Sequence, residues 1–266
     1  MAVKKRPISA RLQKCCYAIL VPALFIGFWQ IIASAGFFLR TFLPAPLDVL
    51  QAVFELAQTG DLLRHASASL FRAFSGFLLA SMIAIPSGLV LGFFKTAGDA
   101  FDGLIHIFRT ISPIAWIPLA ILWFGIGDLP AIFIIFITAV FPIIVATIHA
   151  VKHVDPLLLK VARNFGATNK QIILKVIVPS ALPHIFVGLR IALGISWMVI
   201  VAAEMVGMRS GLGYMILDAR NFLRTDMIIA GMIVIGLIGL LLDKLMSKAE
   251  MLISNNRDSL ECTETQ

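Results

Sequence analysis

The sequence predicts an all-α membrane protein that crosses the bilayer about six times. Hydrophobic residues make up 59% of the 266 residues and charged residues only 14%, whereas soluble domains carry about 25% charged residues. The mean hydropathy is +0.95, and the apolar runs lack the strict alternation expected of barrel strands. About six helices of roughly 20 residues occupy most of a chain of this length. We therefore expect no soluble catalytic domain beside the membrane helices.

Six apolar runs are each long enough for a membrane helix. The runs are Tyr17–Ala35, Phe74–Phe94, Leu104–Phe124, Leu129–Ala150, Ile185–Ala203 and Met227–Leu245. The basic residues before the first run, and the small residues at positions 33–35, also fit a secretory signal with its cleavage site. Because this run is longer than a signal core and further spans follow it, we predict an uncleaved first span.

The distribution of Lys and Arg predicts that both termini are cytoplasmic. With the N-terminus inside, the cytoplasmic side receives most of the 22 basic residues, namely Lys4, Lys5, Arg6, Arg11, Lys14, Lys95, Lys152, Lys160, Arg163, Lys170, Lys175, Lys244, Lys248 and Arg257. The outer side receives Arg40, Arg64, Arg72, Arg209, Arg220 and Arg224. Such a bias in short loops sets orientation, so we interpret the net charge of +7 as topology rather than nucleic-acid binding. The predicted domains are a cytoplasmic tail (1–16), one transmembrane domain (17–250) and a polar C-terminal tail (251–266).

A short amphipathic helix is predicted between the first two spans, after Pro44 and Pro46. Its apolar set is Leu47, Leu50, Val53, Phe54 and Ala57, and its polar set is Asp48, Gln51, Glu55 and Gln58. Apolar residues at helical spacing on one face indicate a helix that lies along the outer surface.

Small residues recur every four positions in the second span, at Gly76, Ala80, Ala84, Gly88 and Gly92. They form a ridge without large side chains, which another helix can approach closely. We interpret this ridge as a packing surface rather than a ligand-binding surface.

Residues 151–183 leave the membrane between the fourth and fifth spans and predict two short helices joined by a tight turn. Asp155 is a good N-cap followed by a proline, and Gly166 supplies the left-handed residue that ends the first helix. Thr168–Gln171 fits a capping box that opens the second helix, which we expect to end at Pro179. We refer to residues 155–179 as the bracket.

The residues alone leave two interpretations of the bracket open. Its first helix carries Leu157, Leu158, Val161 and Phe165. If these side chains are exposed to the cytosol, they favour docking to a partner protein. Alternatively, the bracket folds back against the chain's own helices.

The bracket also has a long, fixed spacing of motif residues. Lys160-Val161-Ala162 is followed after three residues by Gly166, and after nine more by Val176-Ile177-Val178-Pro179. This resembles the EAA loop of ATP-binding-cassette (ABC) importer permeases, a Glu-Ala-Ala, Gly, Ile-x-Leu-Pro pattern. Lys160 and Val161 depart from its Glu and first Ala, so an ion pair made by that Glu does not carry over. Leu43–Pro46, Ile111–Pro118 and Ala202–Met205 resemble the nitrate, sulfonate and taurine type.

The resemblance implies a type I ABC importer permease fold and a permease subunit of an ATP-driven importer in the bacterial inner membrane. It implies a second copy of the permease, two cytoplasmic subunits that use ATP and Mg, and a periplasmic or lipid-anchored solute-binding protein. The chain itself would be neither an enzyme nor a cofactor-binding protein. The solute would be a small anion of the nitrate, sulfonate, taurine or bicarbonate type. The implied ATPase-coupling residues are Asp155, Leu158, Lys160, Val161, Ala162, Arg163, Phe165, Gly166, Ala167 and Pro179.

Prolines at 113 and 118 predict that the third span is a broken helix, because proline removes an intrahelical hydrogen bond. Broken helices near mid-membrane often line a solute path. The candidate pathway residues are Arg109, Ser112 and Trp116 here, Ser196 and Trp197 on the fifth span, and Glu204 at its end. An arginine beside a pore suits an anion. The alternative for Arg109, and equally for Arg190, is a side chain that snorkels to the membrane surface.

Glu204 is the only carboxylate at the end of an otherwise apolar span. A carboxylate in hydrocarbon usually faces protein or water, because burying its charge there is unfavourable. The sequence therefore leaves two interpretations: a gate or structural ion pair, or an interfacial residue before the Gly-rich stretch Arg209–Gly213.

The sequence lacks complete motifs for metal binding and for P-loop binding of ATP. His149 and His153 are four residues apart without a suitably spaced Cys or carboxylate, so no metal site is predicted. Gly92–Thr96 lacks the glycine before the lysine of a P-loop, so partner subunits would have to bind the ATP. Cys15, Cys16 and Cys262 also lack metal-binding spacing.

Two other function classes remain as alternatives. An ion-coupled carrier acting without an ATPase would usually show inverted repeats and several intramembrane carboxylates. An intramembrane enzyme would need a Ser/His/Asp or paired-carboxylate set, which the spans do not contain.

Overall fold

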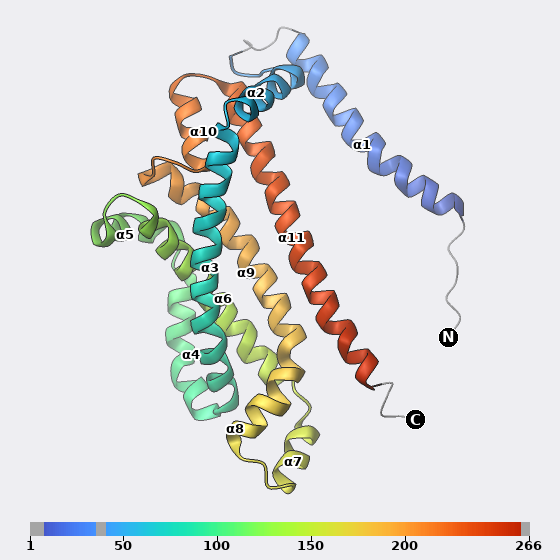
Figure 1. Cartoon of the computed structure of the whole chain (residues 1–266), viewed down its shortest axis with the longest axis vertical. Coiled ribbons are helices and arrows are strands. Elements are labelled where there is room, and N and C mark those ends of the chain that lie inside the picture. The colour runs from blue at the N-terminus through green and yellow to red at the C-terminus, as the bar shows by residue number, and fades with distance from the viewer. Residues whose placement is uncertain (1–7, 36–40, 262–266) are drawn as a thin grey trace. The chain divides into compact units, whose positions relative to one another are not determined.

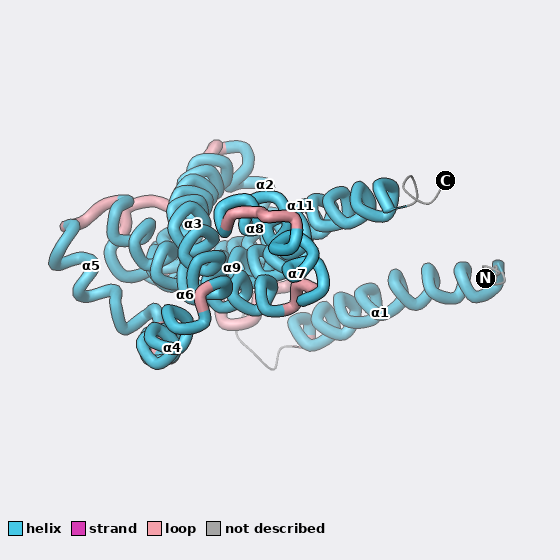
Figure 2. The backbone as a smooth tube through the Cα atoms, turned by 90° about the horizontal axis from the view of Figure 1, so that it is seen from below, coloured by secondary structure: helices cyan, strands magenta, loops and turns pink. Residues whose placement is uncertain are grey.

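The computed structural model describes residues 8–35 and 41–261, with side chains described for residues 20–35 and 41–252. Within these ranges every regular element is a helix (Figure 2), as the sequence predicts. The elements are α1 (Ile8–Ser34), α2 (Pro46–Gln58), α3 (Asp61–Phe93), α4 (Lys95–Thr110), a 3-10 turn (Pro113–Trp116), α5 (Ile117–Phe124), α6 (Asp128–Lys152), α7 (Pro156–Asn164), α8 (Asn169–Ile172), a π-helical turn (Ile173–Ile177), α9 (Val178–Gly207), α10 (Leu212–Asn221) and α11 (Thr225–Glu261). They belong to two compact units, residues 1–62 with 216–232 and residues 63–215 with 233–266.

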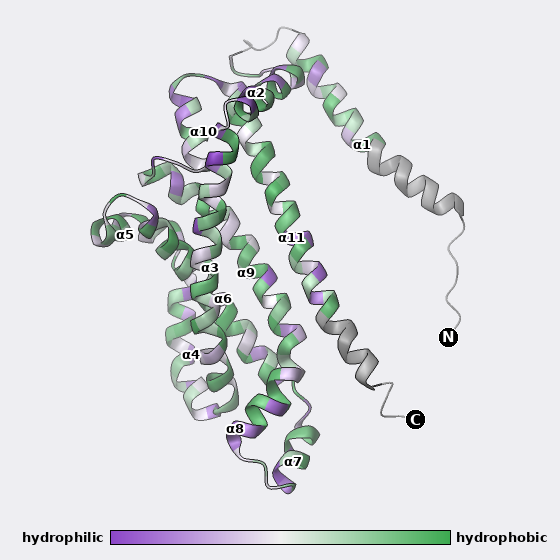
Figure 3. Ribbon diagram, in the orientation of Figure 1, coloured by the Kyte–Doolittle hydropathy of each residue, from purple (hydrophilic) through white to green (hydrophobic). Residues whose placement is uncertain are grey.

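Four described helices are long and apolar enough to cross a bilayer: α3, α6, the continuous helix Asn169–Gly207, and α11 as far as Leu252. Figure 3 shows apolar residues along these helices and polar residues gathered at α8 and α10. Helices α4 and α5 form a fifth span only if the two bent arms are counted together. The predicted first span lies within α1, whose described apolar part, Leu20–Ser34, is shorter than a span. A multi-pass helical membrane protein is confirmed, whereas the count of six stays a prediction.

The ends of the chain are only partly described. The predicted N-terminal tail becomes helical at Ile8, and α11 continues as a helix into the predicted polar tail as far as Glu261. Residues 1–7 and 262–266, including Cys262, lie outside the described residues, as do the side chains of Cys15 and Cys16.

The third predicted span is broken, but at one place rather than two. Helix α4 ends at Thr110, and the helix that follows is turned by 85°. Pro113 opens the 3-10 turn at the break. Pro118 does not interrupt a helix, because it occupies the first turn of α5, where its missing N–H has no helical partner to lose.

The prediction that the second bracket helix ends at Pro179 is wrong. The chain stays helical from Asn169 through Gly207. A proline ring clashes with the carbonyl four residues earlier, which here belongs to Lys175. Because Lys175 lies in the π-helical turn, the wider turn lets the helix pass Pro179 without a break.

Helix α3 begins thirteen residues before the predicted span, at Asp61 rather than Phe74. The polar residues of its first turns lower the local hydropathy, so a search for apolar runs misses them. Arg72, which the charge count places in an outer loop, is a buried helical residue instead. Removing Arg72 from the outer-loop count leaves the basic residues on the predicted cytoplasmic side unchanged.

The small-residue ridge of α3 packs closely against α6, which confirms its interpretation as a packing surface. Ala80 and Ala84 are fully buried. A Cβ atom added at Gly76 would lie 2.6 Å from the Ile132 carbonyl oxygen, and one at Gly88 would lie 2.6 Å from Thr147 Cβ. Helix α9 packs along another side of α6 (Figure 1), so α6 forms the centre of the larger unit.

Replacing Gly88 with leucine should force α3 and α6 apart, because the new side chain would overlap Thr147. We expect a loss of at least about 1–3 kcal/mol, the usual penalty for overpacking a well-packed core. Thermal unfolding of the detergent-solubilised protein measures this loss. Gly103→Leu is the matched control, since no atom lies within 4 Å of a Cβ at Gly103. Equal melting temperatures for the two variants would contradict the close approach.

Candidate functional site

The bracket is capped at both ends of α7 and at the start of α8. Asp155 Oδ1 accepts a hydrogen bond from Leu157 N at 2.8 Å, which satisfies a free N–H at the start of α7. Gln171 Oε1 accepts from Thr168 N at 2.8 Å, and Thr168 Oγ1 accepts from Gln171 N at 3.4 Å. These bonds confirm both predicted N-caps, including the capping box of α8.

The turn between α7 and α8 depends on Gly166. Its φ of +75° lies in the left-handed region that favours glycine. The Gly166 N–H donates to Arg163 O at 2.9 Å, and the Ala167 N–H donates to Ala162 O at 3.1 Å. This is the Schellman pattern that ends helices. Of the predicted coupling residues, Ala162, Arg163, Gly166 and Ala167 therefore shape the turn through their backbone.

The bracket presents an apolar face to its surroundings rather than folding it away. Leu157, Leu158 and Val161 are exposed, and Phe165 at the tip is 87% exposed. The basic side chains of Lys160 and Arg163 are exposed beside them. Figure 1 shows α7 and α8 together beyond one end of α9. The structure therefore favours a docking surface over a loop packed against the chain's own helices.

A cavity of about 370 Å³ opens beside the break in the third span. It is bounded by the end of α4, by α6 and by α9. Among the described residues that line it, only Arg109 is charged. Phe108, Phe141, Ile191 and Ile195 supply much of its apolar wall. Arg109 itself is exposed, so its charge is accessible to an anionic group beside the apolar wall.

Stacked aromatic rings hold the break in place. The Phe108 ring lies 5.5 Å from that of Phe141 and 6.2 Å from that of Trp116, measured between centroids. The Trp116 indole nitrogen is buried and has no hydrogen-bond partner among the described atoms. Ser112 is exposed at the break, directly before the 3-10 turn.

The structure does not bring the fifth-span candidates to the Arg109 cavity. Ser196 is fully buried, and within the described chain its hydroxyl has no partner. The Trp197 indole donates to Ile235 O of α11 at 3.0 Å and lines a separate cavity of about 210 Å³. Arg190 borders that second cavity and forms a paired hydrogen bond with Asp243, at 2.6 and 2.9 Å. Arg190 is thus tied to α11 rather than free to snorkel.

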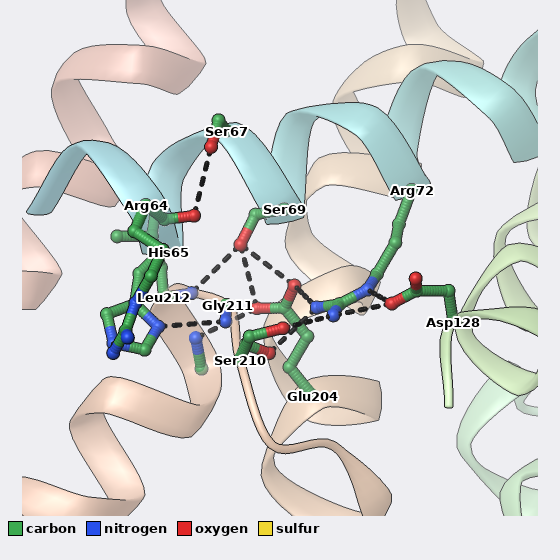
Figure 4. A network of polar contacts seen from close by, with 11 residues as sticks. Arg64, His65, Ser67, Ser69, Arg72, Asp128, Glu204, Ser210, Gly211 and Leu212 are labelled. Atoms are coloured by element: carbon green, nitrogen blue, oxygen red, sulfur yellow. Dashed lines mark hydrogen bonds and ion pairs between the residues drawn. The ribbon is translucent and has the colours of Figure 1, made fainter. Parts of the chain in front are cut away.

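Glu204 is the centre of a buried polar network that we call the clasp (Figure 4). The clasp comprises His65, Ser69, Arg72, Asp128, Glu204 and residues 210–213. The Glu204 side chain is 0% exposed. Its oxygens accept from Ser69 Oγ at 2.8 and 2.9 Å, from Arg72 Nη1 at 2.8 Å, and from Gly213 N at 2.9 Å. Glu204 therefore forms a buried structural ion pair with Arg72 and is not an interfacial residue.

Arg72 joins three segments of the chain through one guanidinium group. It is 3% exposed and donates from Nη1 to Glu204 and, at 2.8 Å, to Ser210 O. Nη2 donates to Ser210 Oγ at 2.6 Å, and Nε donates to Asp128 Oδ1 at 2.7 Å. Helix α3, the start of α6 and the loop after α9 are thereby pinned together.

The backbone of the loop after α9 completes the clasp. Gly211 N donates to His65 Nδ1 at 3.0 Å, and Leu212 N donates to Ser69 Oγ at 2.9 Å. Gly211 has a φ of +112°, and a Cβ there would overlap the Glu204 carboxylate. The Gly-rich stretch after Glu204 is thus a close-fitting cover for the carboxylate, not a free loop.

Sequence reasoning missed the α3 side of the clasp. His65, Ser69 and Arg72 follow the spacing i, i+4, i+7, which places them on one face of a helix. A polar stripe at this spacing just before the second span, together with a carboxylate at the end of the fifth span that needs a partner, is the signal that could have identified them.

The family described as "binding-protein-dependent transport system inner membrane component" matches residues 69–247. The chain belongs to this family. The matched range contains the break in the third span, the bracket and every residue of the clasp except His65. The permease is also similar over nearly its whole length to proteins described as transport permeases.

Two such relatives show how far the similarity extends. The permease is 37% identical to a protein of Bacillus subtilis (strain 168) described as an aliphatic sulfonates transport permease, over 98% of this chain and 94% of that protein. It is 36% identical to the nitrate import permease protein of Synechococcus elongatus, over 90% and 89% of the two chains. Both similarities extend over most of each chain.

A solved structure of the MetNI methionine ABC transporter in an inward-facing conformation has a similar fold. The TM-score is 0.67 with 21% sequence identity, and the match covers 74% of the permease and 98% of that chain. At this identity the likeness shows the fold alone.

Proposed function

We propose that the chain is the transmembrane permease subunit of an ATP-driven importer of type I in the bacterial inner membrane. A second copy would complete the pathway, and two cytoplasmic ATP-binding subunits would supply energy from ATP with Mg. A periplasmic or lipid-anchored binding protein would deliver the solute. Membership of the family and the relatives' names support the general role.

The exposed apolar face of the bracket carries the proposal. An exposed Phe165 with neighbouring Leu158 and Val161 on a capped, rigid turn fits a helix that docks into a groove of a partner. The helix from α8 runs without interruption into α9, which supplies Ile191 and Ile195 to the Arg109 cavity. A force applied at the bracket can therefore reach the cavity wall through one continuous helix.

Charge supports the orientation and the class of solute. A cytoplasmic bracket is supported by its basic residues Lys160, Arg163, Lys170 and Lys175, because short cytoplasmic loops are enriched in Lys and Arg. Arg109 gives the cavity one positive charge, which suits a small anion such as nitrate, a sulfonate, taurine or bicarbonate. The solute-binding protein would select among these, so a ligand screen on that partner would identify the solute.

Reconstitution into vesicles tests the proposal. The permease should take up solute only when the ATP-binding subunits, ATP with Mg and the binding protein are all present. Uptake driven by an ion gradient with the permease alone would replace the proposal with an ion-coupled carrier. Vesicles with a catalytically inactive ATP-binding subunit provide the control for passive leakage.

Replacing Arg109 with glutamine should reduce solute uptake by at least about tenfold, which corresponds to the loss of an interaction worth 1.4 kcal/mol. The amide keeps much of the side chain's size but not its charge. Arg109→Lys should retain more uptake because it keeps the charge. Arg209→Gln, at an exposed arginine outside the cavity, is the matched control. Undiminished uptake by Arg109→Gln in an assembled complex would remove Arg109 from the pathway.

A further inference from the structure

Helix α2 has two apolar faces, and only one of them is covered. The covered face consists of Val49, Ala52 and Leu56, which are buried. The other face consists of Leu47, Leu50 and Phe54, each 63–64% exposed, and we call it the α2 stripe. At 100° per residue the two faces lie on roughly opposite sides of the helix. The apolar face that the sequence predicts for this amphipathic helix is therefore mostly the exposed face, the α2 stripe.

The polar residues of α2 occupy an edge between the two faces. Asp48, Gln51 and Glu55 line a polar cavity of about 380 Å³ within the smaller unit. Asp48 Oδ2 also accepts from Ala45 N at 3.0 Å, so it caps the start of its own helix. Both carboxylates thus point away from the α2 stripe, which carries no charge.

Contacts within the smaller unit tie α2 to the start of the candidate span in α11. Arg224 Nη2 donates to Glu55 Oε2 at 2.9 Å, and the Thr225 hydroxyl donates to Thr41 O. Thr225 is the first residue of the candidate span in α11. Hydrogen bonds to Asp226 and Glu55 raise the pKa of Arg224, so this anchor stays charged at any physiological pH. Helix α2 is therefore tied to the level at which a span enters the membrane.

A second contact ties α2 to the end of α1. The Trp29 indole, in the last turns of α1, donates to Pro44 O at 3.2 Å. Tryptophan is enriched at membrane–water interfaces, where its ring is in apolar surroundings and its N–H finds a polar partner. Both neighbours of α2 in the chain's smaller unit thus place it at the same boundary.

We propose that α2 is an interfacial helix and that the α2 stripe inserts into the phospholipid of the bilayer surface at this end of α1 and α11. An apolar stripe at the boundary between headgroups and acyl chains is the arrangement of amphipathic helices that lie in the membrane plane. Because α2 has no Lys or Arg, its insertion depends on apolar burial rather than on attraction to anionic lipid. This inference concerns how α2 contacts the bilayer and does not rest on the proposed transport function.

Quenching by brominated lipid tests the insertion. Cys15, Cys16 and Cys262 are first replaced by serine in the full chain. Single cysteines are then placed at Phe54 and Leu50 on the stripe, and at Gln51 on the polar edge as the matched control. Each is labelled with an environment-sensitive fluorophore and reconstituted into phosphatidylcholine vesicles with or without brominated acyl chains.

Labels at Phe54 and Leu50 should be quenched at least about twofold more than the label at Gln51, because the stripe contacts acyl chains and the edge does not. Adding phosphatidylglycerol or raising salt should leave the difference unchanged. Equal quenching at all three positions would overturn the proposal, as would quenching that appears only with anionic lipid. Unquenched stripe labels would show that protein covers the stripe: another part of the chain, a second copy or a partner. Two stripe positions are labelled so that the experiment still gives a result if one of the two variants fails to fold.

Discussion

Replacing Arg72 with methionine should destabilise the permease by about 3–5 kcal/mol, the usual loss when one partner of a buried ion pair is removed. Glu204 would remain fully buried without its cation. Three segments joined by the guanidinium would also lose their common contact. Thermal unfolding and the yield of monodisperse protein from the membrane measure the effect.

The double replacement Arg72→Met with Glu204→Leu separates charge burial from packing. It should recover much of the stability lost in the single variant, because two apolar side chains replace a buried pair without leaving a charge. Recovery should be incomplete, since the Gly213 N–H and Ser69 hydroxyl lose their acceptor. Arg209→Met is the control, at an exposed arginine just before the clasp loop. A single variant as stable as this control would contradict the clasp.

Replacing Phe165 with aspartate should weaken binding of the ATP-binding subunits by about 30-fold or more, as expected when a hot-spot aromatic worth at least 2 kcal/mol is lost from an interface. Because Phe165 is 87% exposed, its replacement should leave the fold of the permease unchanged. Co-purification and titration with the ATP-binding subunits measure the affinity, and thermal unfolding checks the fold.

Phe222→Asp is the matched control for Phe165→Asp, because Phe222 is also a highly exposed phenylalanine but lies far along the chain from the bracket. Gly166→Pro should have a similar effect to Phe165→Asp, since proline cannot adopt the positive φ of the turn. Ala162→Glu should also interfere, by adding a charge beside the apolar face. Normal retention of the ATP-binding subunits by all three bracket variants would refute docking at this surface.

Most of the helical content follows from patterns that are local in the chain. Long apolar runs locate α6 almost to the residue, because its sequence is apolar on every side. The bracket is equally predictable, since Asp155, Gly166 and Thr168 act through bonds to residues only a few positions away. Pro179 misleads because a π-helical turn, which no simple pattern announces, absorbs its effect.

The candidate sites also contain some features that follow from the sequence and others that depend on tertiary structure. Phe165 is exposed, and Arg109 is the only charged residue among the described residues that line its cavity, but their roles in docking and in anion binding stay predictions. By contrast, the sequence groups Trp197 with Arg109 because both lie in predicted spans, yet the Trp197 indole donates to Ile235 O of α11 and Trp197 lines a separate cavity. Which face of an apolar helix turns toward a cavity depends on its neighbours, and an apolar run has no period that reveals it.

The sequence by itself determined an all-helical, multi-pass membrane protein and a capped bracket, because both depend on hydropathy and on short-range hydrogen bonds. Only the tertiary structure decided what surrounds Glu204. Its partners Ser69 and Arg72 lie more than 130 positions away in the chain. A carboxylate in an apolar span must find a cation or donors somewhere, but hydropathy carries no information on which distant helix supplies them. Packing of α3 against α6 brings Arg72 beside Asp128, and the loop after α9 then covers the buried charge.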